Sequence, residues 1–127
     1  MGDEAVMGLI RRYMEAYNAF DVDGMVKLLH DGIEFRNYAN GSVTTETRGI
    51  ESFRRLAEQS KALFGERRQT ITYAAENGGR IEVGIDYEGT LAADLPNGMK
   101  AGERIRLQGK SVFVVKEGKL TVIEDYS

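Results

Sequence analysis

The chain has no cysteine and only one histidine among its 127 residues. The lack of cysteine excludes disulfide bonds and thiol catalysis, and it fits a reducing compartment. Zinc is usually held by cysteine and histidine together, so a zinc or other transition-metal site is not expected. We therefore expect a protein that works without a metal and without any other cofactor.

Long apolar runs and basic tracts are lacking as well. No segment is apolar enough to span a membrane or resembles a signal peptide, so we expect a cytoplasmic protein without membrane contact. The net charge is -3, and the doublets Arg54-Arg55 and Arg67-Arg68 are isolated. We expect these arginines at the surface and expect no nucleic-acid partner. The length predicts a single domain over residues 1–127.

Apolar residues with helical spacing occupy the first part of the chain. The first predicted helix runs from Asp3 to Phe20, and its apolar stripe consists of Val6, Leu9, Ile10, Tyr13, Tyr17 and Phe20. Asp21 or Asp23 can cap a second helix, which Asp31-Gly32 would end. The apolar positions of this second helix are Met25, Leu28 and Leu29. His30 would lie at its C-terminal end, where the helix dipole favours a positive charge.

A short strand and a third helix are predicted next. The strand covers Ile33–Tyr38 and places Ile33, Phe35 and Asn37 on one side, before a turn at residues 40–42. The helix covers Gly49–Phe64 and ends at Gly65. Its apolar stripe is formed by Phe53, Leu56, Ala57, Ser60 and Phe64.

After the third helix the periodicity changes to that of strands. Thr70–Glu76 and Arg80–Ala93 are predicted strands, joined by the three-residue loop Asn77-Gly78-Gly79. This loop would pair Ile71 with Ile85 and Tyr73 with Val83, apolar against apolar. Residues 95–98, which include the only proline, would turn the chain into a last hairpin.

The last hairpin, Arg104–Ser127, carries the sharpest register information. Glu117-Gly118 is a two-residue loop with glycine where a tight turn needs a positive φ, so Lys116 would face Lys119. In that register one face holds the pairs Val114/Thr121, Val112/Ile123 and Lys110/Asp125. The other face holds Val115/Leu120, Phe113/Val122 and Ser111/Glu124. Both faces are apolar near the turn, so we expect one to line a core or pocket and the other to meet a partner subunit.

Helices first and long strands afterwards predict an α+β fold. We expect a curved antiparallel β-sheet with three N-terminal helices packed on its concave face. A curved sheet and an amphipathic helix layer close into a cone, which usually leaves an apolar cavity between the layers.

Two segments resemble a known superfamily. RYMEAYNAFDVDGMVKLLHDGIEF, residues 12–35, is similar to the N-terminal signature of the nuclear transport factor 2-like superfamily, particularly its ketosteroid isomerase and SnoaL-like polyketide cyclase members. RLQGKSVFVVKEGKLTVIEDY, residues 106–126, resembles the last hairpin of the same superfamily. The resemblance implies a cystatin-like cone. It implies no single activity, because the superfamily contains isomerases, cyclases, lyases and plain binding modules.

The resemblance can be carried over residue by residue. In ketosteroid isomerases an aspartate is the base, and a tyrosine with a protonated aspartate stabilises the oxyanion. The tyrosine position falls on Tyr13, the base position on Asn37, and the protonated aspartate position on Lys110. An amide cannot take a proton from carbon near neutral pH, so Asn37 argues against steroid isomerisation by that route. A lysine can still stabilise an oxyanion.

The opposed charges Lys110 and Asp125 are the main catalytic candidates, with Tyr13. Two interpretations of the pair stay open: an exposed ion pair at the rim of the sheet, or a pair inside the cavity. If the last strand presents its other face to the cavity, Glu124 replaces Asp125. The side chains predicted to bind substrate are Tyr17, Phe35, Asn37, Phe53, Tyr87, Val112 and Ile123.

Three hypotheses for function follow, all with a small apolar molecule as partner and a homodimer formed through the convex sheet face. The first is a cofactor-independent isomerase, cyclase or lyase acting on a carbonyl or phenolic compound. Tyr13 and Lys110 would stabilise an enolate, and Asp125 would be the base or hold Lys110. The second is a ligand-binding module without turnover, and the third is a dimerisation domain whose cavity is filled by its own side chains.

Overall fold

The computed structural model describes residues 2–127, and Met1 lies outside the described residues. It contains three helices, α1 (Gly2–Asn18), α2 (Val22–Val26) and α3 (Ile50–Lys61). The strands are β1 (Leu29–Ala39), β2 (Ser42–Arg48), β3 (Phe64–Asn77), β4 (Arg80–Leu91), β5 (Arg104–Lys116) and β6 (Lys119–Tyr126). No helix of the described residues is long and apolar enough to cross a membrane.

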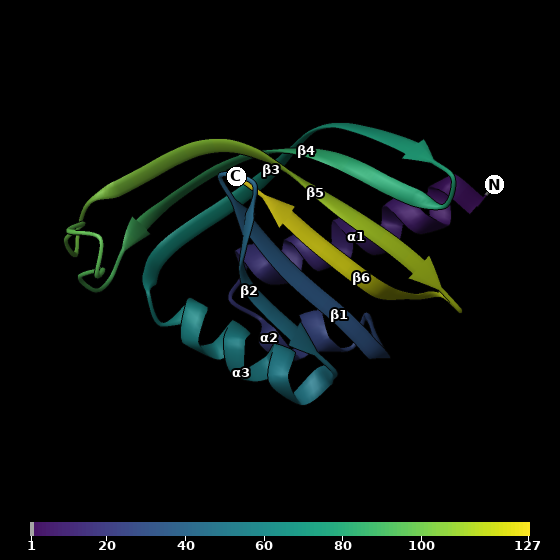
Figure 1. Cartoon of the computed structure of the whole chain (residues 1–127), viewed down its shortest axis with the longest axis horizontal. Helices are drawn as coiled ribbons and strands as arrows, with labels where there is room; N and C mark the ends of the chain where they lie inside the picture. The colour runs from purple at the N-terminus through teal and green to yellow at the C-terminus, as the bar shows by residue number, and fades with distance from the viewer. Residues whose placement is uncertain (1) are drawn as a thin grey trace.

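The six strands form one curved sheet in the order β2-β1-β6-β5-β4-β3. Neighbouring strands are antiparallel except β1 and β6, which run parallel. All three helices lie under the concave side of this sheet (Figure 1). The predicted α+β architecture is confirmed, and the parallel pair makes the sheet mixed rather than wholly antiparallel. After β2 the chain passes through α3 to β3, at the opposite edge of the sheet. It then returns strand by strand until β6 lies beside β1.

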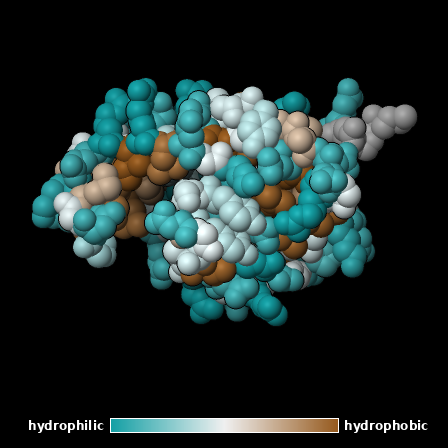
Figure 2. Space-filling model, turned by 45° about the horizontal axis from the view of Figure 1, so that its top comes forward, coloured by the Kyte–Doolittle hydropathy of each residue, from teal (hydrophilic) through white to brown (hydrophobic). Residues whose placement is uncertain are grey.

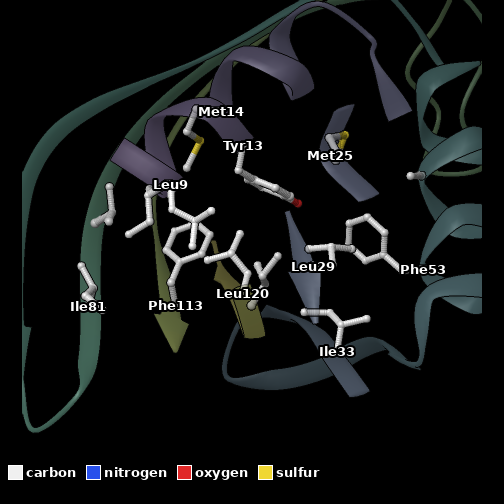
Figure 3. Close-up of a cluster of buried hydrophobic side chains, with 14 of the residues drawn as sticks. Leu9, Tyr13, Met14, Met25, Leu29, Ile33, Phe53, Ile81, Phe113 and Leu120 are labelled. Carbon is white, nitrogen blue, oxygen red and sulfur yellow. The ribbon is translucent and has the colours of Figure 1, made fainter. Parts of the chain in front are cut away.

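The core lies between α1 and the middle of the sheet. Leu9, Ile10, Tyr13 and Met14 are the buried residues of α1, spaced as one amphipathic face requires. The Tyr13 ring meets Phe113 of β5 edge to face, with 5.9 Å between the ring centroids (Figure 3). Helix α1 is thereby fixed against the strands that carry the last hairpin.

The second helix is shorter than predicted. Asp21 caps it as expected, accepting a hydrogen bond from the Gly24 amide at 2.9 Å, but the helix ends at Val26. Leu29 already belongs to β1 and pairs with Leu120 of β6. The prediction that Leu29 and His30 are helical is therefore wrong. Parallel pairing with a strand about 90 residues away overrides the local helical pattern.

Strand β2 and the start of β3 were not predicted. Strand β2 is an edge strand with polar, mostly exposed residues, so it lacks the apolar alternation that identifies strands. Helix α3 ends at Lys61, and β3 begins at Phe64 instead of Thr70. Phe64 is therefore a strand residue, and Gly65 is not a helix stop.

Both predicted hairpins contain a β-bulge. In the last hairpin, Lys116 pairs with Lys119 as predicted, but a bulge beyond Val115 shifts the register by one residue. The next pairs are Val114/Val122, Phe113/Ile123, Val112/Glu124, Ser111/Asp125 and Lys110/Tyr126. The predicted Lys110/Asp125 pair is wrong for this reason. A bulge leaves one residue unpaired and changes every opposed pair beyond it.

A bulge also shifts the register of the hairpin formed by β3 and β4. Here the pairs near the loop differ from the prediction, and the bulge returns the register to the predicted one. Its loop has two residues, so Asn77 pairs with Arg80, and a bulge then restores the predicted pair Ile71/Ile85. The predicted pair Tyr73/Val83 is wrong, because Tyr73 pairs with Gly84 on the outer face of the sheet. Gly84 is required there: a Cβ would collide with the Tyr73 ring.

Candidate functional site

A cavity with two connected lobes lies between the helices and the concave face of the sheet. The volumes of the lobes are about 290 Å³ and about 220 Å³. Both are lined by four shared residues: Tyr17, Asn37, Ser60 and Asp125. Figure 2 shows the molecule hollowed beside the projecting arm of the sheet, where hydrophobic residues gather. Together the lobes have the size of a site for a small organic ligand.

Asp125 of β6 lies where the two lobes meet. Its Oδ1 atom accepts a hydrogen bond from the Ser111 hydroxyl at 2.7 Å, across the pair that the bulge creates. Burial raises the pKa of the Asp125 carboxyl to about 6, and the Ser111 hydrogen bond opposes this rise. A carboxyl with this pKa exists in both protonation states near neutral pH, so it can accept a proton and return it.

Tyr13 contributes a hydroxyl to the second lobe. Its ring is buried against Phe113, and its oxygen points away from Phe113 toward the space between Met25 and Phe53 (Figure 3). The hydroxyl has no hydrogen-bond partner among residues 4–127. Burial, with a smaller contribution from the charge of Asp125, raises the pKa of Tyr13 well above its usual value. Tyr13 therefore stays protonated and has a hydrogen bond to offer a ligand.

A pair of phenols lines the first lobe. The hydroxyl oxygens of Tyr17 in α1 and Tyr87 in β4 are 3.0 Å apart. Burial raises the pKa of both phenols. Since each hydroxyl has one proton, one tyrosine donates to the other, and the second keeps its proton for a ligand oxygen.

Asn37 and two phenylalanines complete the predicted binding residues that line the cavity. Asn37 pairs with Asp125 across β1 and β6 and lines both lobes, while its amide donates to the Thr44 Oγ1 atom at 2.8 Å. Phe35 and Phe53 pack edge to face at 5.8 Å and line the second lobe. The polar centre of the cavity therefore has an apolar wall on its α3 side.

The structure does not bring Lys110 to Asp125. The Lys110 ammonium lies 3.3 Å from Glu82 Oε1 and 5.3 Å from the centroid of the Tyr126 ring, on the outer face of the sheet. Its backbone neighbours Gly109 and Ser111 line the first lobe, and Lys110 itself lies at the rim of that lobe. The predicted charge pair is thus replaced by the Ser111–Asp125 hydrogen bond.

Two further predicted binding residues do not line the lobes. Val112 lies on the outer face of the sheet, as Lys110 and Glu124 do. It is two residues from Lys110 on β5 and pairs with Glu124, and alternate residues of a strand point to opposite faces. Ile123 does face inward, but it is fully buried in the core cluster. The alternative that Glu124 replaces Asp125 in the cavity is also wrong: Glu124 is bound by Arg80 and Arg36 on the outer face.

Sequence reasoning missed several residues of the site. Ser111 was assigned to the face opposite Asp125, and only the bulge brings the two together. Gln69 lines the first lobe from a part of β3 that precedes the predicted strand. Arg67, expected at the surface, is 6% exposed and packs against the Tyr17 ring. Its position in an alternating stretch with Gln69 and Ile71 is the signal that could have identified an inward side chain.

No metal-binding geometry is seen in the part of the chain that the structure describes. Within the described residues, no group of three or more histidine, cysteine, aspartate or glutamate side chains lies close enough to hold a metal ion. The polar groups that line the cavity are carboxyl, hydroxyl and amide groups, with the Lys110 ammonium at the rim of the first lobe. Such a set can donate hydrogen bonds to a ligand oxygen and exchange a proton with it.

Comparison with protein families and solved structures agrees with this architecture. The family model described as the SnoaL-like domain matches residues 10–123. The curated proteins give no match. A candidate polyketide cyclase from Xanthomonas campestris pv. campestris has a similar structure, with a TM-score of 0.83, 21% sequence identity, and coverage of 98% of this chain and 90% of that chain.

Two other solved structures show the same fold. A Catenulispora acidiphila protein with a ketosteroid isomerase-like fold, in complex with trimethylamine, has a TM-score of 0.77 at 15% identity, covering 94% of this chain and 84% of that chain. A cystatin-fold protein from Novosphingobium aromaticivorans has a TM-score of 0.72 at 22% identity, covering 93% of this chain and 94% of that chain. The predicted cystatin-like, nuclear transport factor 2-like cone is confirmed.

Proposed function

The chain belongs to the SnoaL-like domain family, and from this premise we propose that it binds a small, mostly apolar carbonyl or phenolic compound and transfers a proton at one of its carbon atoms. The reaction class is that of a cofactor-independent isomerase or polyketide cyclase-like lyase. The candidate polyketide cyclases among the similar structures are consistent with a flat, polyketide-like ligand.

One observation carries the proposal: the Asp125 carboxyl lies at the junction of the two lobes with its pKa raised to about 6. As a carboxylate it takes a proton from the carbon next to the ligand carbonyl, and the electron pair of that C–H bond moves onto the carbonyl oxygen. The Tyr13 hydroxyl, which is otherwise unpartnered among the described residues, donates a hydrogen bond to the resulting enolate. Protonated Asp125 then returns the proton.

The fate of the enolate decides between two outcomes. Protonation at a different carbon gives an isomer. Attack of the enolate carbon on a second carbonyl of the same molecule closes a ring, and the proton held by Asp125 goes to the new alkoxide. The apolar wall formed by Phe35 and Phe53 can pack against the apolar part of such a ligand.

The second candidate function is ligand binding without turnover. Asn37 favours it, because the resembled isomerases have their base at this position and an amide cannot serve as one. The Asn37 amide instead donates to Thr44, which holds the side chain in place. Asp125 is in that case a hydrogen-bonding group of the binding site.

A ligand screen followed by an isotope-exchange assay tests the proposal. Melting temperature is first measured against phenols, steroids and polyketide-like aromatics, since a ligand at 100 times its Kd adds about 2.7 kcal/mol of stability. For each ligand that binds, exchange of the hydrogen next to the carbonyl is followed by NMR in D2O. We expect Asp125→Asn to keep binding and to slow exchange by about 100-fold or more.

Asp86→Asn is the matched control, because Asp86 is an exposed aspartate of β4. It should change neither binding nor exchange. Exchange that proceeds equally fast in Asp125→Asn would refute the assignment of the base. Ligands that bind to the wild type without any exchange would favour the binding module.

A further inference from the structure

Arg67 of β3 is a buried cation that has no counter-ion among the described side chains, residues 4–127. The residue is 6% exposed, and its Nε atom donates to the Tyr17 carbonyl oxygen at 3.1 Å. Its Nη2 atom is buried and has no hydrogen-bond partner among residues 4–127, and Arg67 forms no ion pair with an acidic side chain of those residues. A buried charge is costly to desolvate, so an arginine that only fills space is an unfavourable choice here.

Two aromatic rings from the end of α1 hold this guanidinium. Its central carbon lies 3.7 Å from the centroid of the Tyr17 ring and 4.6 Å from that of Phe20. Phe20 adopts the left-handed conformation, with φ of 59°, which is strained for a bulky residue. The chain thus tolerates backbone strain at the position that brings a second ring to the cation.

The other end of Tyr17 reaches the cavity. Its hydroxyl is 3.0 Å from that of Tyr87, and both residues line the lobe that Asp125 also lines. Burial raises the pKa of Tyr17 and Tyr87, and the Arg67 charge opposes the rise in both. A cation on a phenol ring makes its hydroxyl a stronger donor, and a chain of two hydroxyls strengthens the terminal bond further.

We propose that Arg67 is a positioning residue that acts through the Tyr17 ring, making the Tyr17–Tyr87 hydroxyl pair the subsite for a second, phenolate oxygen of the ligand. This inference rests on the proposed function, because it names the part of the same cavity that receives a ligand oxygen other than the enolate oxygen at Tyr13. Arg67 need not touch the ligand. When a phenol binds, its proton leaves to the buffer, and the tyrosines keep theirs and donate hydrogen bonds.

The charged and titratable groups facing this subsite determine how it must be tested. They are Arg67, Tyr13, Tyr17 and Tyr87 and, on the other side of the lobe, Asp125, Lys110 and Tyr126. Because ionised Asp125 would repel a phenolate, the ionisation of a bound phenol is measured in the Asp125→Asn variant. The probe is 4-nitrophenol, whose neutral and anionic forms absorb at different wavelengths. 4-Nitroanisole, which cannot ionise, reports binding alone.

We expect the pKa of 4-nitrophenol to fall on binding to the Asp125→Asn variant, by roughly one unit, or tenfold in acidity. Adding Arg67→Met should abolish this fall while 4-nitroanisole still binds. Arg67→Lys, which restores a charge, should recover part of it. Arg68→Met removes the exposed neighbouring charge and should leave the fall unchanged.

Tyr17→Phe keeps the Arg67 cation and removes the hydroxyl, so it should also abolish the fall in the pKa of 4-nitrophenol. If Arg67→Met does not fold, the result for Tyr17→Phe decides whether the subsite acts as proposed. If the pKa of bound 4-nitrophenol falls as much in Arg67→Met or Tyr17→Phe as without these changes, the role of Arg67 is overturned and the proposed function stays intact. A bound 4-nitrophenol whose pKa is not lowered at all overturns it too. If neither probe binds, both the inference and the ligand class of the proposed function are rejected.

Discussion

Asp125 and its sequence neighbour Glu124 show how one strand creates two different carboxyl groups. Asp125 faces the cavity, where burial dominates and raises its pKa to about 6. Glu124 faces the outer side, where burial would raise its pKa as well. Hydrogen bonds from Tyr126 and Arg80, with the charge of Arg36, more than offset that effect and lower the pKa of Glu124. Only Asp125 is suited to exchange protons near neutral pH.

The raised pKa of Asp125 predicts a pH-dependent stability difference. Between pH 4 and pH 6 the unfolded chain loses the Asp125 proton while the folded chain keeps it, so folding stability falls as pH rises through this window. A shift of about two pKa units corresponds to about 2–3 kcal/mol. Urea unfolding of the wild type and Asp125→Asn should show the wild type losing this amount relative to the variant between pH 4 and pH 7.

The comparison is made as a difference so that other titrating groups cancel. Above pH 7 the difference should be constant, because Asp125 is then ionised in both states. Asp86→Asn, which alters an exposed carboxyl, is the matched control and is measured over the same range. A flat profile for Asp125→Asn would mean that the cavity does not shield its carboxyl from water.

At the scale of elements, Asn18 joins the end of α1 to the edge of the sheet. Its Nδ2 atom donates to the Gln69 carbonyl oxygen at 3.1 Å, and its Oδ1 atom accepts from the Gln69 amide at 2.7 Å. The side chain thus takes the place of one residue of a neighbouring strand and covers part of the open edge of β3. The same contact fixes the spacing between Tyr17 and Arg67 on either side of it.

Removal of this amide should weaken the contact between α1 and β3. Asn18→Ala leaves the donor and acceptor of Gln69 unpaired, and we expect it to lower the free energy of unfolding by about 1–3 kcal/mol. Hydrogen exchange at the Gln69 amide should become faster. Asn18→Asp keeps the acceptor and should retain protection of that amide. Equal exchange in wild type and Asn18→Ala would show that the contact is not formed in solution.

At the scale of the whole molecule, the outer face of the sheet carries a continuous row of paired residues. The row runs through Val43, Tyr38, Tyr126, Lys110 and Tyr73. Tyr38 and Tyr126 stack with 4.6 Å between their centroids, and Val43 and Tyr73 are 50% and 48% exposed. We propose that a second copy of the chain covers this face, as the two apolar faces of the last hairpin led us to expect.

Sedimentation equilibrium tests the homodimer. Val43→Lys places a charge on the row without disturbing a buried residue, and in a two-fold symmetric interface the change counts twice. Burial of an unpaired ammonium is costly, so we expect the dimer to dissociate at concentrations about 100-fold higher than for the wild type. Gln59→Lys, on the exposed side of α3, should leave the dimer intact. A wild type that sediments as a monomer would refute the proposal.

The local features of this fold followed from the sequence. The amphipathic stripe of α1, the Asp21 cap and the Glu117-Gly118 loop depend on neighbouring residues, and each is confirmed. Tyr13, Tyr17 and Tyr87, which were predicted as site residues, line the cavity. Neighbouring residues of a helix or a turn interact in any fold that contains that helix or turn. Their spacing in the sequence therefore predicts it.

Tertiary structure decided which residues meet across the cavity. The bulge beyond Val115 pairs Asp125 with Ser111 instead of Lys110, and parallel pairing with β6 converts Leu29 from helix to strand. The burial of Arg67 depends on rings that only the end of α1 supplies. These contacts join residues far apart in the chain, and a one-residue shift reverses every face beyond it. Because no local pattern encodes such a shift, only the folded molecule fixes the chemistry around Asp125.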